Sequence, residues 1–468
     1  SNEVNFDSCD ASIVGGCNNE IFAYAKQSAI VGGYNNFVGY FSCQSGILAG
    51  RFNTVMDGSC YSVILGGLDN CICYASSCSS ILGGCGNIMR YSYNTQIVGG
   101  SWDRSCYSCA NVIAGGGGNR TFYSKRSGIF TGHCNHICGY DGYIPGYGTG
   151  NYSIQTSTIL GGSCNRICDI THASSIQGGC RNCIHNYGYG QCVWSSVING
   201  GYQNKIYDDT YSSVINGGCF NYIRCSGYSV INGGYSNCIC SGTWTSVING
   251  GCGNSMREYT CYSVIEGGTC NYMYSTCRSA IIAGRGHYIG YNGYNTIAGG
   301  GYNCICCSSY NSIIGGCDNR ICENSCYGSI IGGCGNLLYC VSYSSILGGC
   351  DNSVRNYSEL STVIGGYNNS IYKGSCCSSI IGGRCNQLYC FSCDSSIIGG
   401  FNNRLCCSSN SAIIGGQNMT LTGKSNTVLF CCIGTNYDGS NYFGVQTCNV
   451  NAGGVNFCIR NGIIVGIS

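Results

Sequence analysis

The chain has 468 residues, only 9 % of them charged, and 21 Lys and Arg against 19 Asp and Glu give a formal net charge of +2. Ordinary globular domains carry about 25 % charged residues, so uncharged side chains must form most of this surface. The small net charge argues against nucleic-acid binding, and the 44 % of apolar residues argue against intrinsic disorder.

Glycine and cysteine dominate the remaining composition, with 77 Gly and 45 Cys against a single Pro. So many cysteines in a reducing compartment would need metals or redox roles at many sites. We therefore expect an oxidising setting, either extracellular or on a virion surface. The cysteine count is odd, so at least one thiol stays free or pairs between chains.

An internal repeat begins near the N-terminus and fixes the expected fold. The second glycine of an Ile-x-Gly-Gly motif, here called the marker glycine, recurs at Gly16, Gly33, Gly50 and onward to Gly416, mostly in steps of 16 or 17 residues. Ser-x-Ile before the marker and Asn-x-Ile after it alternate with period two, which predicts two short strands per repeat. A Gly-Gly pair in most repeats, about every 17 residues, excludes helix. The pattern predicts an all-β fold, a parallel β-solenoid (β-roll) of about 25 coils over residues 1–416.

Two places interrupt the period, and the C-terminal segment departs from it. The coils around 140–162 are irregular, because Pro145 replaces the isoleucine before Gly148, and residues 185–193 read as an inserted loop. We expect residues 417–468 to form a C-terminal β cap and trimerisation segment, because an open solenoid end exposes strand edges.

The asparagine three residues after the marker predicts a polar ladder inside the solenoid. An inward amide can hydrogen bond to the coils above and below, and asparagine also tolerates left-handed backbone. The marker glycine is expected to supply positive φ and close approach between coils.

The residue two positions before the marker should point outward, yet it is aliphatic in most coils, as in Val31, Leu48, Ile331 and Ile381. A column of this length is too apolar to face water, so we expect neighbouring copies to cover it in a symmetric homo-oligomer. Six consecutive coils carry polar residues there instead: Gln177, Asn199, Asn216, Asn232, Asn249 and Glu266. We interpret them as a polar layer on the axis between chains, either an amide ladder that fixes register or an ion site.

Stretches such as Ser28-Ala29-Ile30-Val31-Gly32-Gly33 and Ser379-Ile380-Ile381-Gly382-Gly383 give the chain a resemblance to known repeats. Over about residues 9–420 it resembles the head repeats of trimeric autotransporter adhesins and similar viral fibre-like Ile-x-Gly-Gly proteins. The resemblance implies a left-handed parallel β-roll that closes as a homotrimer. The repeat here is longer and richer in cysteine than the usual adhesin unit.

Cysteines also recur in columns, as in Cys317, Cys334 and Cys350. Neighbouring coils place equivalent Cα atoms about 4.8 Å apart, within the range that a disulfide spans. We expect a disulfide ladder there, with cysteine as a mere strand filler as the alternative. His133, His136 and Cys138 are weaker candidates for a metal site, because extended backbone sends alternate residues to opposite faces.

The sequence favours a non-enzymatic protein with no cofactor, since no nucleophile motif, phosphate loop or acidic pair recurs. The leading hypothesis is a rigid trimeric fibre for attachment at an extracellular or virion surface. Its expected partners are its own copies and a host-cell glycan or surface receptor, with no membrane insertion. The alternative is a structural filament or sheath subunit that polymerises end to end and is hardened by disulfides.

Overall fold

The computed structural model describes residues 1–144, 148–152, 154–186, 192–435, 441–451 and 454–456. The chain divides into two compact units, residues 1–245 and 246–468, and each is described by itself. The secondary structure of the described residues consists of short β-strands. Among these residues, no helix has the length and hydropathy needed to cross a membrane.

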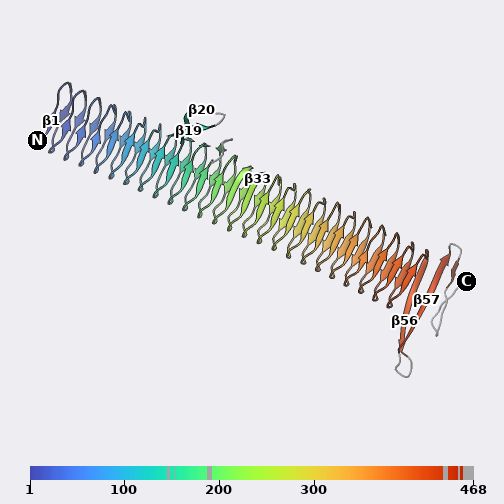
Figure 1. The fold of residues 1–468 in the computed structure, drawn as a ribbon. Coiled ribbons are helices and arrows are strands. Elements are labelled where there is room, and N and C mark those ends of the chain that lie inside the picture. The colour runs from blue at the N-terminus through green and yellow to red at the C-terminus, as the bar shows by residue number, and fades with distance from the viewer. Residues whose placement is uncertain (145–147, 153, 187–191, 436–440, 452–453, 457–468) are drawn as a thin grey trace. The chain divides into compact units, whose positions relative to one another are not determined.

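Each coil of the first unit contributes a strand before the marker glycine and a strand after it. β4 (Ala29–Ile30) and β6 (Gly46–Ile47) belong to the first set and pair in parallel, with Ile30 opposite Ile47. β3 (Glu20–Ile21) and β5 (Phe37–Val38) belong to the second set and pair in the same way. The strands stack coil upon coil (Figure 1), which confirms the predicted parallel β-solenoid.

Some coils of the first unit add a third strand on the return segment. β16 (Ser124–Lys125), β21 (Ile154–Gln155), β24 (Thr171–His172) and β27 (Val193–Trp194) form this short additional sheet. At the end of the unit, β33 (Cys238–Trp244) runs through both the second and the third side of its coil.

The predicted irregular coil around 140–162 is a hairpin, not a coil. β19 (Tyr140–Ile144) and β20 (Gly148–Tyr152) pair antiparallel and lie beside the stacked coils (Figure 1). β17 (Gly128–Ile129) pairs directly with β22 (Thr158–Ile159), so the stack continues without this segment. The solenoid therefore has about 24 coils, not 25. Pro145 and residues 187–191 of the predicted inserted loop lie outside the described residues.

From β38 (Ala280–Ile282) onward in the second unit, the strand before the marker has three residues in place of two, as in β42 (Ser312–Ile314). The glycine before the marker takes positive φ here, and the N–H of Gly315 donates to the Ala298 carbonyl of the preceding coil at 2.7 Å. This added bond ties the corner of each coil to its neighbour.

The final segment continues the stack before it changes direction. β55 (Thr420–Thr422) and the start of β56 (Thr427–Thr435) still pair in parallel with the preceding coil. β57 (Asn441–Asn451) and β58 (Gly454–Asn456) then follow in antiparallel order. Whether residues 417–468 act as a cap and trimerisation segment stays a prediction.

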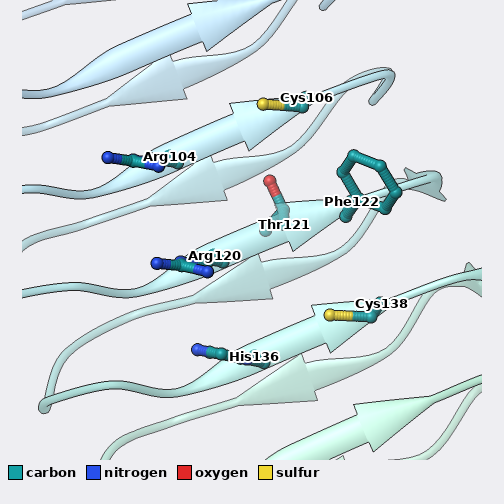
Figure 2. Close-up of a pocket in the computed structure, with 7 residues that line it drawn as sticks. All are labelled: Arg104, Cys106, Arg120, Thr121, Phe122, His136 and Cys138. Carbon is teal, nitrogen blue, oxygen red and sulfur yellow. The ribbon is translucent and has the colours of Figure 1, made fainter.

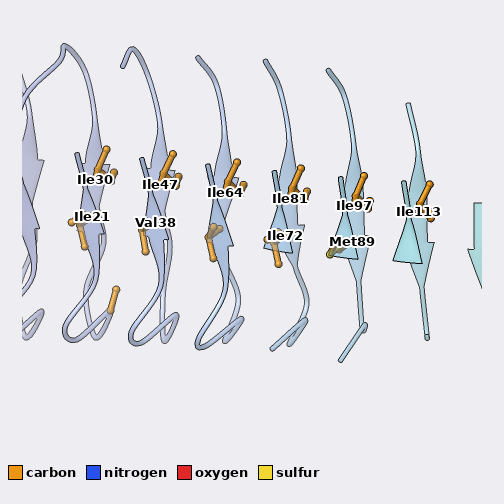
Figure 3. Close-up of a cluster of buried hydrophobic side chains, with 12 residues drawn as sticks. Ile21, Ile30, Val38, Ile47, Ile64, Ile72, Ile81, Met89, Ile97 and Ile113 are labelled. Carbon is orange, nitrogen blue, oxygen red and sulfur yellow. The ribbon is translucent and has the colours of Figure 1, made fainter. Parts of the chain in front are cut away.

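Two columns of aliphatic side chains fill the interior. Ile30, Ile47 and Ile64 come from the strands before the marker, and Ile21 and Val38 come from the strands after it. All five are fully buried, and Figure 3 shows the two rows side by side along the first coils. Stacking identical residues in this way buries each methyl group against its copy in the next coil.

The buried asparagines form the predicted ladder. Most of its hydrogen bonds join a side-chain amide to a backbone group, not to another side-chain amide. The Nδ2 of Asn36 donates to the carbonyls of Gly32 in its own coil and Gly50 in the next, at 3.1 and 3.0 Å. Its Oδ1 accepts the N–H of Asn53 at 3.0 Å. The left-handed backbone lies one residue earlier, at Asn35 with φ of 57°. The expectation that the inward asparagine itself adopts this backbone is therefore wrong.

The marker glycines lie where two coils come closest. Gly50 has φ of 96°, and a β-carbon there would overlap the carbonyl oxygen of Gly67 and the Nδ2 of Asn53. No side chain fits this position, which explains why glycine recurs there.

Two coils replace the ladder asparagine by an ionisable residue, Asp103 or His287, both fully buried. The Oδ1 of Asp103 accepts the N–H of Asn119 at 2.8 Å, as an asparagine would. Its Oδ2 takes the place of the donating Nδ2 and has no hydrogen-bond partner. Burial raises the pKa of Asp103 to about 6, because the carboxylate has lost its contact with water. A protonated carboxyl would restore the missing donor.

Asp103 should therefore make the stability of the first unit depend on pH. Its pKa is above the ordinary value of 3.8, so its contribution is complete below about pH 4 and is lost as pH rises through about 6. Asp103→Asn should raise the free energy of unfolding at pH 8 by about 3 kcal/mol and have little effect at pH 4. Chemical denaturation of both proteins at the two pH values measures this difference. The exposed Asp69→Asn is the matched control, and an equal gain in the control would contradict the ladder explanation.

Candidate interaction surface

The outward residue of the strand before the marker forms an apolar stripe in the first unit, hereafter the N-terminal stripe. Apart from Val14, which follows the partly buried Ile13, its members follow fully buried isoleucines, and all are between 39 % and 74 % exposed: Val14, Val31, Leu48, Leu65, Leu82, Val98, Phe130 and Leu160. Because the coils stack in register, these side chains share one column, in which the smaller Ala114 lies between Val98 and Phe130. The predicted outward orientation is confirmed.

The second unit carries an equivalent row, hereafter the C-terminal stripe. Its members are between 40 % and 49 % exposed: Ile282, Ile314, Ile331, Leu347, Ile364, Ile381 and Ile398. The contrast between adjacent residues is sharp, since Ile313 is fully buried and Ile314 is half exposed. Exposed aliphatic rows of this length mark interaction surfaces in soluble proteins.

The polar residues predicted for an axial layer occupy the same outward position, and all six are exposed. Within the first unit, Nδ2 of Asn199 donates to Oδ1 of Asn216, and Nδ2 of Asn216 donates to Oδ1 of Asn232, both at 2.6 Å. Gln177 lies in the coil before them, and Asn249 and Glu266 belong to the second unit. The asparagines thus form an exposed amide ladder along one chain, and the inter-chain axis stays a prediction.

Aromatic side chains form another exposed row on the second unit. Tyr294, Tyr310, Tyr327 and Tyr343 stack with ring centroids 4.7–4.9 Å apart and planes within 11° of parallel. Each ring face therefore lies against the next tyrosine, and mainly the ring edges reach solvent. A sugar would find hydroxyl-bearing edges on this row, with few open faces to stack on.

Cys317, Cys334 and Cys350 lie in one column, and each is a free thiol. The Sγ atoms of Cys317 and Cys334 are 3.1 Å apart, so a small side-chain rotation would bring them to bonding distance. The Sγ of Cys350 contacts the Oδ2 of Asp351 at 3.6 Å and also interacts with the thiol of Cys334, but the closest pair of thiols is Cys317 and Cys334. The geometry thus favours one pair within the predicted ladder.

Mild oxidation of the folded chain should link Cys317 to Cys334 and leave Cys350 free. The bond closes a loop of 17 residues and should stabilise the second unit by about 3 kcal/mol. Peptide mapping without reduction identifies the pair. Cys317→Ser should leave Cys334 without its nearest thiol, whereas preferential Cys334–Cys350 pairing in the unaltered chain would contradict the geometry.

The weaker metal candidates are only partly brought together. His136 and Cys138 lie on one face of β18 (His136–Cys138) and line a shallow pocket of about 350 Å³ with Arg104 and Arg120 (Figure 2). His133 lies before this strand, bridged to Gly117 and Ser163. The thiol of Cys168 hydrogen bonds to Cys138 and, with the nearby His136, lowers the pKa of Cys138 to about 5. Two guanidinium groups in the pocket, those of Arg104 and Arg120, disfavour a cation there.

Convergent metal-ligating groups lie elsewhere in the part of the chain that the structure describes. Cys390, Cys406 and Cys407 form one group, and Cys317, Asp318 and Cys334 form another, each with ligand atoms within 4.8 Å of one another. Sequence reasoning missed the first group. The signal was present, because Cys390 and Cys407 both fall seven residues after a marker glycine in neighbouring coils.

Comparison with known proteins adds no further assignment. No protein-family model matches the chain, and no curated protein matches it significantly.

Proposed function

We propose that the chain is a non-enzymatic fibre subunit that assembles as a homotrimer, with its apolar stripes buried between copies. The proposed setting is extracellular or on a virion surface, and the proposed role is attachment to a host-cell glycan or surface receptor. The observation that carries the proposal is the pair of exposed aliphatic rows, one on each unit. Water-facing strands do not sustain such rows without a partner.

A second copy of the same chain is the simplest occupant for the stripes. A symmetric assembly places identical residues opposite one another, so an aliphatic row meets an aliphatic row. The exposed Asn199–Asn216–Asn232 ladder supports the same arrangement. In a symmetric assembly this ladder would lie opposite the equivalent ladder of a neighbouring copy, so amide groups would face amide groups. The number three comes from the resemblance to adhesin head repeats.

The rest of the surface is consistent with a non-enzymatic protein that attaches to a receptor. It carries few charges and many tyrosines, whose hydroxyl edges can hydrogen bond to polar receptors. The oxidising setting follows from the cysteine content, and the close Cys317–Cys334 contact supports hardening by disulfides.

Light scattering coupled to size exclusion tests the assembly directly. The unaltered chain should elute as a discrete species with three times the chain mass. Ile331→Lys combined with Ile364→Lys should give a monomer, because each lysine would place a charge in an apolar contact. Its β-sheet circular dichroism should be unchanged, since both positions are outward.

Tyr327→Lys combined with Tyr343→Lys is the control, because these residues are at least as exposed as the two isoleucines but lie off the stripe. The control should remain a trimer. A monomeric unaltered chain, or a stripe variant that still forms a trimer, would contradict the proposal. Open-ended assemblies that grow with concentration would replace it with the filament alternative.

A further inference from the structure

The surface of the second unit carries a cluster of three thiols, hereafter the thiol triad, which consists of Cys390, Cys406 and Cys407. Their Sγ atoms all lie within 4.8 Å of one another, and those of Cys406 and Cys407 are 3.6 Å apart. Cys390 and Cys406 are half-buried and Cys407 is exposed, so both an ion and a chemical reagent can reach them.

The backbone explains why three thiols converge. β51 (Gln387–Tyr389) pairs in parallel with β53 (Arg404–Cys406), so Tyr389 lies opposite Cys406 and Cys390 lies level with Cys407. Cys390 and Cys407 have φ of 55° and 48°. This left-handed turn ends the alternation of the strand, so the consecutive Cys406 and Cys407 can present their thiols to the same side.

The donor set selects the class of ion. Three sulfur atoms bound at about 2.3 Å in a trigonal plane lie about 4 Å from one another, which agrees with the observed spacing. Thiolates bind soft ions, and the group contains no histidine or carboxylate that would suit a harder one. Structural zinc sites take four protein ligands, whereas this group offers three, a number that suits monovalent copper.

We propose that the thiol triad is a trigonal binding site for Cu(I) in the reduced chain. As three S–Cu bonds form, three thiol protons leave to solvent, and no atom changes its oxidation state. The loaded site carries a net charge of −2. Arg404 lies two residues before Cys406 in β53, on the same face of the strand by alternation, and its positive charge would offset part of this charge. This proposal does not depend on the fibre assembly.

The second convergent group serves as an internal comparison. Cys317, Asp318 and Cys334 offer two thiols and one carboxylate, a harder donor set. Cu(I) should therefore prefer the thiol triad over this group.

Site-resolved alkylation of the full-length reduced protein tests the proposal despite its many cysteines. One equivalent of Cu(I) is supplied in the presence of a competing Cu(I) chelator, and alkylation at each cysteine is followed by peptide mass spectrometry. Cys390, Cys406 and Cys407 should react at least tenfold more slowly with the ion than without it. The reactivity of Cys317 and Cys334 should be nearly unchanged.

Two variants separate binding from folding. Cys407→Ser should abolish the protection of Cys390 and Cys406 while the circular dichroism spectrum stays the same. Cys340→Ser should leave the protection intact. Cys340 is the matched control because it follows Tyr339 at the equivalent place in its coil, has φ of 50° and is half-buried, but lies outside the triad.

Three outcomes would overturn the proposal. Protection could spread over many cysteines, or Cys390 and Cys406 could stay protected in the Cys407→Ser variant. Alternatively, Zn(II) could protect the triad more strongly than Cu(I) under the same competition, which would refute the assignment of the ion.

Discussion

The close approach of successive coils at the marker glycine is the constraint on which the rest of the structure depends. At this corner the backbone adopts positive φ, and the carbonyl of the next coil takes the space of the missing side chain. The side chain of the inward asparagine then donates hydrogen bonds to carbonyls of two coils and accepts one from the backbone N–H of the asparagine in the next coil. Asp103, which replaces one of these asparagines, keeps the acceptor contact but leaves its Oδ2 without a partner. Only asparagine makes the full set of contacts, so glycine and asparagine recur together.

Because this corner fixes the register, residues at each of the remaining positions of the repeat also line up in a column from coil to coil. Isoleucines stack on isoleucines in the core, tyrosines on tyrosines outside, and cysteines on cysteines where the sequence allows. A single residue type repeated along the chain therefore becomes a surface of one chemical character. Two consecutive aliphatic residues in a repeat therefore yield both a buried core column and an exposed apolar stripe.

The repeat made most of the fold predictable from sequence, because the periodicity identifies inward and outward positions. The solenoid, the two aliphatic columns, the asparagine ladder and the outward stripe were all predicted correctly. The hairpin at 140–152 was not, because Gly148 mimics a marker glycine although the backbone there pairs antiparallel. The thiol triad was also missed, since period-two reasoning places consecutive cysteines on opposite faces. It takes the left-handed backbone at Cys407 to bring Cys406 and Cys407 together.

The most direct test of the account compares two adjacent glycines in one coil by amide hydrogen exchange. Gly300 has φ of 86°, and a β-carbon there would collide with the Gly316 carbonyl, whereas at Gly301 it would meet the Arg285 carbonyl at an ordinary 3.9 Å. The account predicts that Gly300→Ala opens the coils on either side and raises their exchange rates at least a hundredfold, while Gly301→Ala leaves them almost unchanged. Equal protection in the two variants would contradict the central role of this corner.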